Sequence, residues 1–175
     1  GNSPERNPPF FVSDNVVTEQ WVFVYRNAVK FHWSSLADLK PYRVAMIQDY
    51  TYTPEIWTMA NAGAFKSDKL SNESAAIKML LLDRVDVAPM ERNVACDVLQ
   101  KNFTDDDAAK LSVHPKQMID TFTSHVLLPR ALPASANLAL EFNAGLKKLK
   151  ASPEYNKLLS QVKCPSGWSG TAAGK

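Results

Sequence analysis

Residues 77–95 read IKMLLLDRVDVAPMERNVA, and this stretch decides the fold class. Its first part spaces apolar residues such as Ile77 and Leu80 as on one face of a helix. Residues 85–90 follow as a short, nearly continuous apolar run, which is typical of a strand buried on both faces of a parallel sheet. Residues 93–101 again favour a helix. This order predicts an α/β protein built on a doubly wound sheet in three layers.

Glu91 follows the apolar run directly and is the first candidate for a ligand contact. In a doubly wound sheet, ligands bind beyond the carboxyl ends of the strands, where a carboxylate can hold an ammonium group. The alternative is that Glu91 only favours the first turn of the next helix, where negative charge is stabilised. The stretch by itself leaves both interpretations open.

A second candidate is the loop over residues 49–53, which follows a strand predicted over residues 42–48 (YRVAMIQ). Thr53 is a typical helix N-cap, and Pro54 suits the first helical position. A helix start in this place points free backbone N–H groups at the crevice and offers an anion site. The residues expected to line its entrance are Tyr50, Thr51 and Tyr52. The alternative is an ordinary loop whose tyrosines pack at the surface.

The composition fits a soluble globular protein with one substantial core, or one domain with extensions. The chain has 175 residues, of which 45% are hydrophobic and 22% are charged. A net charge of +2 without a block of Lys or Arg argues against a nucleic-acid partner. No apolar run approaches the roughly 20 residues that span a bilayer, and residues 1–9 lack the apolar centre of a signal peptide. The 3 histidines have no ligand spacing, so we expect neither a metal nor another cofactor.

Cys96 and Cys164 are the only cysteines, and they lie too far apart for a CxxC redox or zinc motif. In an exported protein, a disulfide between them would tie the C-terminal tail to the helix after Glu91. In a cytosolic protein, Cys96 would be a small buried hydrophobic residue. Both alternatives stay open at this point.

The remaining chain predicts further elements. Strands are expected over residues 20–26 and 119–128, with an extended segment at 130–132 and a helix over 155–162. Residues 134–150 form an amphipathic helix, and the residues on its apolar face are Leu138, Phe142, Leu146 and Leu149.

Three motifs resemble a known family. They are Ser3-Pro4-Glu5-Arg6 followed by Phe10-Phe11-Val12-Ser13, then Ser35-Leu36-Ala37-Asp38-Leu39-Lys40, then Arg84-Val85-Asp86-Val87-Ala88. Their order and spacing resemble the type II bacterial solute-binding proteins of the polar amino acid kind (extracellular solute-binding protein family 3). The fold of that family is related to the ligand-binding domains of ionotropic glutamate receptors.

The resemblance implies a division of the chain. Residues 1–20 would be a remnant of lobe one, residues 21–128 lobe two, residues 129–162 the return crossing and C-terminal helices, and residues 163–175 a flexible tail. The chain would then be a fragment that lacks most of lobe one. The apolar face of its C-terminal helices would be covered by self-association or strand exchange.

The resemblance also assigns roles to individual residues. Arg6 resembles the arginine that grips a ligand carboxylate, with a frayed N-terminal arginine as the alternative. Thr51 and neighbouring N–H groups resemble the contribution of lobe two to the same anion, and Glu91 would take the α-ammonium group.

The chain departs from the family pattern at four positions. Glu91 stands where aspartate is more common, Pro89 falls inside the predicted strand, and Asp49 and Asp83 stand where glycine is usual. The aromatic residues Tyr50, Tyr52 and Trp57 favour either an aromatic or cationic ligand, or packing in the core or rim.

The implied function is a non-catalytic, extracytoplasmic receptor of an ABC importer, periplasmic or lipid-anchored. Its partners would be a small polar, amino-acid-like solute, which carries both an ammonium and a carboxylate group, and the membrane subunits of the transporter. One alternative is the ligand-binding domain of a signalling receptor. Another is a dehydratase-type enzyme of the same fold, for which only Glu91 and the distant His125 offer an acid–base pair.

Overall fold

The computed structural model describes residues 9–119 and 122–168, which form parts of two compact units. Unit 1 comprises Gly1–Glu19 and Asp120–Val162, and unit 2 comprises Gln20–Ile119 and Lys163–Lys175. The first segment of unit 2 therefore ends at residue 119, and a second segment begins at residue 163. The sequence analysis instead expects lobe two to end at residue 128. Arg6 lies outside the described residues.

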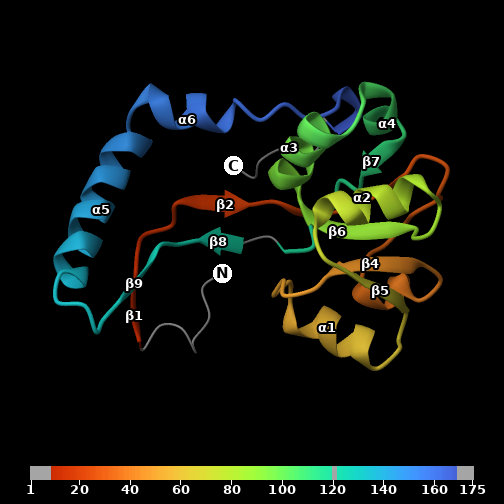
Figure 1. Ribbon diagram of the computed structural model, residues 1–175, viewed down its shortest axis with the longest axis horizontal. Coiled ribbons are helices and arrows are strands. Elements are labelled where there is room, and N and C mark those ends of the chain that lie inside the picture. Colours follow the sequence, from red (N-terminus) through yellow and green to blue (C-terminus); the bar gives the residue numbers. More distant parts are fainter. Residues whose placement is uncertain (1–8, 120–121, 169–175) are drawn as a thin grey trace. The chain divides into compact units, whose positions relative to one another are not determined.

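Unit 2 is built on a five-stranded mixed sheet in the order β5-β4-β6-β3-β7 (Figure 1). Its strands are β3 (Trp21–Arg26), β4 (Arg43–Ile47), β5 (Lys66–Leu70), β6 (Val87–Glu91) and β7 (Leu111–Val113). Strand β4 runs parallel to β5 and β6, while β3 runs antiparallel to β6 and β7. The predicted α/β class is confirmed, but the sheet is mixed and not parallel throughout.

Helices follow the parallel strands and bury their apolar faces. The helices of unit 2 are η1 (Leu36–Leu39), α1 (Pro54–Asn61), α2 (Glu73–Leu81), α3 (Arg92–Asn102), α4 (Asp105–Ala109) and η2 (Ser166–Trp168). Helix α2 packs against β4, β6 and α3 through Ala76, Ile77 and Leu80, which are all fully buried. Burying one such large side chain contributes about 1.5–3 kcal/mol, so this contact anchors the helix layer on the sheet.

Pro89 lies in a central strand, because β6 is placed between β4 and β3. Proline is disfavoured there, since it cannot donate a ladder hydrogen bond. The register explains how it is accommodated. Strand β6 pairs with β4 at Val87, opposite Val44, which comes before the proline. The pairing of β6 with β3 includes the proline itself, with Phe23 opposite Pro89.

The two positions at which the family resemblance leads us to expect glycine have left-handed backbone conformations. Asp49 has a φ of 67° and Asp83 a φ of 57°. This region favours glycine, and aspartate is among the few other residues that enter it. Aspartate at these two positions therefore meets a backbone requirement that glycine would also meet.

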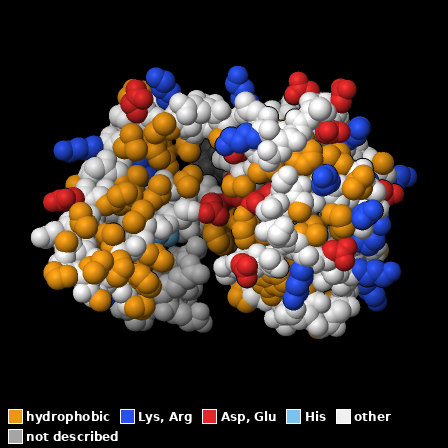
Figure 2. Space-filling view, viewed as in Figure 1, with side chains coloured by type: hydrophobic (Ala, Val, Ile, Leu, Met, Phe, Trp, Pro, Cys, Tyr) orange, Lys and Arg blue, Asp and Glu red, His pale blue; other side chains and the backbone are white. Residues whose placement is uncertain are grey.

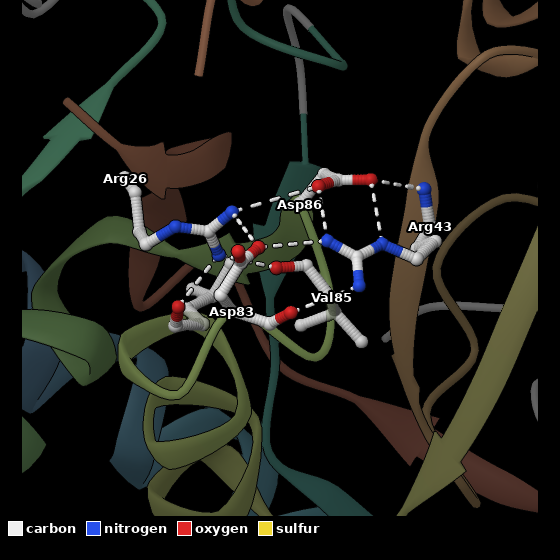
Figure 3. A network of polar contacts seen from close by, with 6 residues as sticks. Arg26, Arg43, Asp83, Val85 and Asp86 are labelled. Atoms are coloured by element: carbon white, nitrogen blue, oxygen red, sulfur yellow. Dashed lines mark hydrogen bonds and ion pairs between the residues drawn. The ribbon is translucent and has the colours of Figure 1, made fainter. Parts of the chain in front are cut away.

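Asp83 also belongs to a network of ion pairs, which we call the amino edge: Arg26, Arg43, Asp83 and Asp86 (Figure 3). One guanidinium nitrogen of Arg43, Nη2, lies 2.8 Å from Asp83 Oδ1 and 2.8 Å from Asp86 Oδ1. Arg26 Nη2 lies 2.6 Å from Asp83 Oδ1. Hydrogen bonds from Arg43 lower the pKa of Asp86. The network joins the end of β3 to the starts of β4 and β6.

Residues 163–168 of the C-terminal segment pack against the rest of unit 2. Cys96 and Cys164 form a disulfide bond, the pairing that the sequence offers as one of two alternatives. Trp168 is fully buried, and its indole N–H donates to the backbone carbonyl of Leu111 at 3.1 Å. The expectation of a flexible tail is therefore wrong for residues 163–168, because the disulfide and the buried indole hold them. Residues 169–175 lie outside the described residues.

Unit 1 consists of two short antiparallel ladders and two helices. Its elements are β1 (Phe10–Val12) paired with β9 (Leu127–Pro129), β2 (Val17–Glu19) paired with β8 (Phe122–Ser124), α5 (Ser135–Lys150) and α6 (Pro153–Leu159). The single strand expected over residues 119–128 is thus wrong, because β8 and β9 belong to different ladders. Residue 130 begins a turn, so the expected extended segment is not formed.

Helix α5 buries a different face from the one its leucines predict. Its buried residues are Ser135, Ala139 and Leu146, whereas Leu138 is 48% exposed and Leu140 is 70% exposed. Figure 2 shows hydrophobic side chains gathered over this helix. Among the described residues, no helix is long and apolar enough to cross a membrane.

Candidate functional site

The carboxyl ends of the parallel strands bring the candidate residues of unit 2 to one place. Strands β4, β5 and β6 are parallel, so Ile47, Leu70 and Glu91 end at the same edge of the sheet. Antiparallel β3 begins at that edge with Trp21, which is paired with Glu91. We call this region the carboxyl edge, and it comprises Trp21, residues 48–53, residues 71–73 and Glu91.

Three helices start at the carboxyl edge, each with a side-chain cap. Thr53 Oγ1 accepts from Ile56 N at 3.3 Å, as the sequence predicts for α1. Asn72 caps α2, and Glu91 caps α3. Helix N-termini carry partial positive charge, so their convergence makes the edge attractive to an anionic group.

Glu91 is 8% exposed, and backbone donors engage both of its carboxylate oxygens. Oε2 accepts from the N–H of Val94 at 2.8 Å, and Oε1 accepts from the N–H of Gln20 at 3.1 Å. The helix-capping interpretation is therefore realised in the structure. A ligand ammonium group at Glu91 would have to share the carboxylate with these donors.

Tyr52 belongs to the core and does not line an entrance. It is 3% exposed, its φ is 43°, and its hydroxyl accepts from the N–H of Ile47 at 2.9 Å. Burial raises the pKa of Tyr52. The left-handed backbone turns this side chain inward, which the sequence does not reveal because tyrosine rarely adopts such a conformation.

Tyr50 is half-buried and fixed at both ends, while its neighbour Thr51 is exposed. The Tyr50 hydroxyl donates to the carboxylate of Glu73, and the Trp57 indole N–H donates to the Tyr50 carbonyl at 2.6 Å. These contacts hold the loop against the start of α2. The structure therefore places Tyr50, Thr51 and Glu91 along one edge of the sheet.

An aromatic cluster lies at the same edge and consists of Trp21, Tyr50, Tyr52 and Trp57. The Trp21 ring meets the rings of Tyr50 and Tyr52 edge-on, at centroid distances of 5.9 and 5.3 Å. The Lys69 ammonium lies over the Trp57 ring, 5.7 Å from its centroid.

Sequence reasoning missed two residues of the carboxyl edge, Trp21 and Glu73. Glu73 is the first residue of α2 and follows Asn72, the N-cap of that helix. Strand β5 ends shortly before, at Leu70. An acid at a helix start after a parallel strand is the same signal that identified Glu91, so it could have been found. Trp21 had no such signal, because its position depends on the antiparallel pairing of β3.

Metal binding has no support in the described part of the chain. No group of three or more His, Cys, Asp or Glu residues there could hold a metal ion. His125, the second residue of the dehydratase alternative, is in unit 1, where its ring nitrogens contact the Ser13 carbonyl and the Thr123 hydroxyl.

Comparison with known proteins shows the fold. No protein-family model matches the chain, and no curated protein matches its sequence. Solved structures do match. An amino acid ABC transporter substrate-binding protein from Streptococcus pneumoniae bound to L-arginine is 20% identical, with a TM-score of 0.71 over 92% of this chain and 64% of that one.

Two further solved structures share the fold. An arginine-specific periplasmic binding protein from Salmonella typhimurium is 19% identical, with a TM-score of 0.64 over 91% of this chain and 67% of that one. The GluR0 ligand-binding core in complex with L-glutamate is 17% identical, with a TM-score of 0.70 over 92% of this chain and 68% of that one. The chain thus has the fold of the amino-acid-binding periplasmic proteins, and it spans about two thirds of the length of these structures.

Proposed function

We propose that the chain is the ligand-binding part of an extracytoplasmic receptor, periplasmic or lipid-anchored, that delivers an amino acid or related small polar solute to the membrane subunits of an ABC importer. Unit 2 corresponds to lobe two in this proposal, and binding involves no chemical step. The observation that carries it is the convergence of Glu91, the loop over residues 48–53 and three capped helix starts at one sheet edge.

The carboxyl edge suits the two charged groups of an amino acid. The Glu91 carboxylate is an acceptor for the α-ammonium group, and charge-assisted hydrogen bonds of this kind are about twice as strong as neutral ones. Exposed Thr51 and the start of α1 offer donors to the α-carboxylate, with the helix dipole adding to the attraction. Arg6 is the proposed second partner of that carboxylate.

The aromatic cluster supplies the apolar part of such a site. Ligand pockets are mostly apolar, with a few polar groups that fix orientation. Trp21 and Tyr50 border Glu91 and Thr51 in this way, because Trp21 is paired with Glu91 and touches the Tyr50 ring. The structural neighbours, which were solved with L-arginine or L-glutamate, support the same ligand class.

The test is a titration of the ¹⁵N-labelled chain with L-arginine, L-glutamine and L-glutamate, followed by amide NMR shifts up to millimolar concentrations. We expect saturable shifts in residues 48–53 and around Glu91 with at least one of them. Glu91→Gln should weaken that binding about tenfold, because it removes the charge facing the ammonium group.

Glu154→Gln is the matched control, since Glu154 lies in the first turn of α6 in unit 1. It should leave the affinity unchanged. A circular dichroism melt of each variant shows whether the fold persists. Equal affinity of the wild-type chain and Glu91→Gln, or no saturable shift with any of the three amino acids, would contradict the proposal.

A second candidate function is the ligand-binding domain of a signalling receptor, which the match to the GluR0 ligand-binding core favours. The site and its ligand class would be the same. Deletion of the gene separates the two: loss of uptake of the ligand supports the importer, and unchanged uptake with loss of a ligand-dependent response supports the sensor.

A further inference from the structure

We infer that Glu73 is a specificity-determining residue of the proposed site and selects amino acids that carry a positive charge on the side chain. The inference rests on the proposed function and deepens it. Glu73 lies at the carboxyl edge, as Glu91 does, but on the far side of β4, since the sheet order places β4 between β5 and β6.

The contacts of Glu73 orient its carboxylate without neutralising it. It is half-buried, and Oε1 accepts a hydrogen bond from the Tyr50 hydroxyl. Within the described part of the chain, no cation is paired with it, and Oε2 has no hydrogen-bond partner. The carboxylate therefore combines a fixed position with an available acceptor atom.

The charges around the carboxyl edge favour a cation. The acids of the carboxyl edge are Asp49, Glu73 and Glu91, and the edge itself contains no basic residue. The neighbouring basic residues already have partners: the Lys69 ammonium lies over the Trp57 ring, and Arg92 Nη2 donates to the Trp168 carbonyl at 3.0 Å. The excess of negative charge disfavours an acidic ligand and attracts a basic one.

The aromatic cluster already contains one contact between a cation and a ring. Lys69 places its ammonium group over Trp57, which shows that this ring already accepts a positive charge from within the chain. Indole faces are the best aromatic partners of cations. Trp57 also holds Tyr50, the residue that orients Glu73.

The spacing of the two acids agrees with a basic amino acid. Glu73 follows β5 and Glu91 ends β6, and these strands are two spacings apart, or roughly 10 Å. An extended arginine or lysine with a hydrogen bond at each end spans a distance of this order. Glu91 then takes the α-ammonium group and Glu73 the cation of the side chain.

The experiment compares L-arginine with L-citrulline, which has nearly the same shape but no charge on its side chain. In amide NMR titrations, the wild-type chain should bind arginine about tenfold more tightly than citrulline. Glu73→Gln should reduce the affinity for arginine about tenfold and change the affinity for citrulline less than twofold, so that the preference disappears.

Glu55→Gln is the matched control, because Glu55 is an exposed acid in the first turn of the neighbouring helix α1. It should leave the preference for arginine intact. Tyr50→Phe keeps the Glu73 charge but removes its orienting hydroxyl, and it should lower the preference by a smaller factor than Glu73→Gln.

The outcomes separate this inference from the proposed function. If amino acids bind but Glu73→Gln leaves the ratio of arginine to citrulline affinity unchanged, or weakens both equally, the role of Glu73 is refuted and the receptor function stands. If no amino acid gives a saturable shift, the receptor function itself is refuted.

Discussion

The two edges of the unit 2 sheet use charge in opposite ways. At the amino edge, two arginines face two aspartates, and the structure joins all four through ion pairs and hydrogen bonds. The carboxyl edge holds three acids and no basic residue, and the neighbouring Lys69 and Arg92 are directed to the Trp57 ring and to a backbone carbonyl. The amino edge is therefore electrically balanced, while the carboxyl edge keeps an excess of one sign.

This difference separates the residues that hold the fold from those that can recognise a ligand. A paired and half-buried charge mainly contributes stability, because removing one partner leaves the other without compensation. An excess of charge contributes little stability, but it attracts ligands of opposite charge and repels ligands of the same charge. Glu91 caps α3 and is also the residue that we propose as the partner of the ligand ammonium group, so it would belong to both groups.

The largest effect on stability is expected at the amino edge. Asp86→Ala should lower the free energy of unfolding by about 2–3 kcal/mol, because Asp86 accepts from the backbone and the guanidinium of Arg43. Urea unfolding measures this loss. Asp83→Gly is the matched control: the Asp83 carboxylate is exposed, Arg26 and Arg43 keep Asp86 as a partner, and glycine suits the φ of 57°, so the change should stay within about 1 kcal/mol.

Acid should remove part of the same contribution. The folded-state pKa of Asp86 is lowered from its usual 3.8, so its stabilisation is complete above that value and is lost as the pH falls through the folded pKa. The stability difference between the wild-type chain and Asp86→Asn should therefore shrink below about pH 3.8. A difference that stays constant from pH 6 to pH 2 would show that the Asp86 charge does not matter.

A smaller effect is expected at Glu91. Glu91→Ala should cost about 1–2 kcal/mol of unfolding free energy, because it removes the α3 cap and the acceptor for Gln20 N–H. Glu91→Asp shortens the side chain but keeps a good N-cap, so it should cost less than half as much. If both variants lose the same amount, the cap is not the source of the stability.

The smallest effect is expected at Tyr50. Tyr50→Phe should lower the free energy of unfolding by about 0.5–1 kcal/mol, since one hydrogen bond to a half-buried carboxylate is lost and the ring contacts remain. Thermal melts of Tyr50→Phe, Glu73→Gln and the double variant test the pair. A double variant that loses the sum of both single effects would show that the two side chains are not coupled.

Local signals account for what the sequence predicts well. The start of α1 at Thr53 and Pro54 is confirmed, because capping and the fixed φ of proline depend only on adjacent residues. The strands β3 and β4 are likewise confirmed within one residue of the predicted ends. Their runs of β-branched and aromatic residues are long enough to specify a buried strand without reference to a partner.

Long-range pairing accounts for what the sequence does not reveal. The split of residues 122–129 into β8 and β9 depends on two partners, β2 and β1, more than 100 residues away. The exposure of Leu138 depends on which side of α5 the rest of unit 1 covers. The contact between Tyr50 and Glu73 likewise joins the loop after β4 to the helix after β5, and only the parallel pairing of those strands brings them together.

The bond between Cys96 and Cys164 closes a covalent ring of chain that contains all of residues 97–163. Segment 120–162, which belongs to unit 1, lies wholly inside this ring. A protease that cuts once within it opens the ring without releasing a peptide. The nicked protein should therefore migrate as one species on a denaturing gel without reductant and divide into two only when a thiol is added.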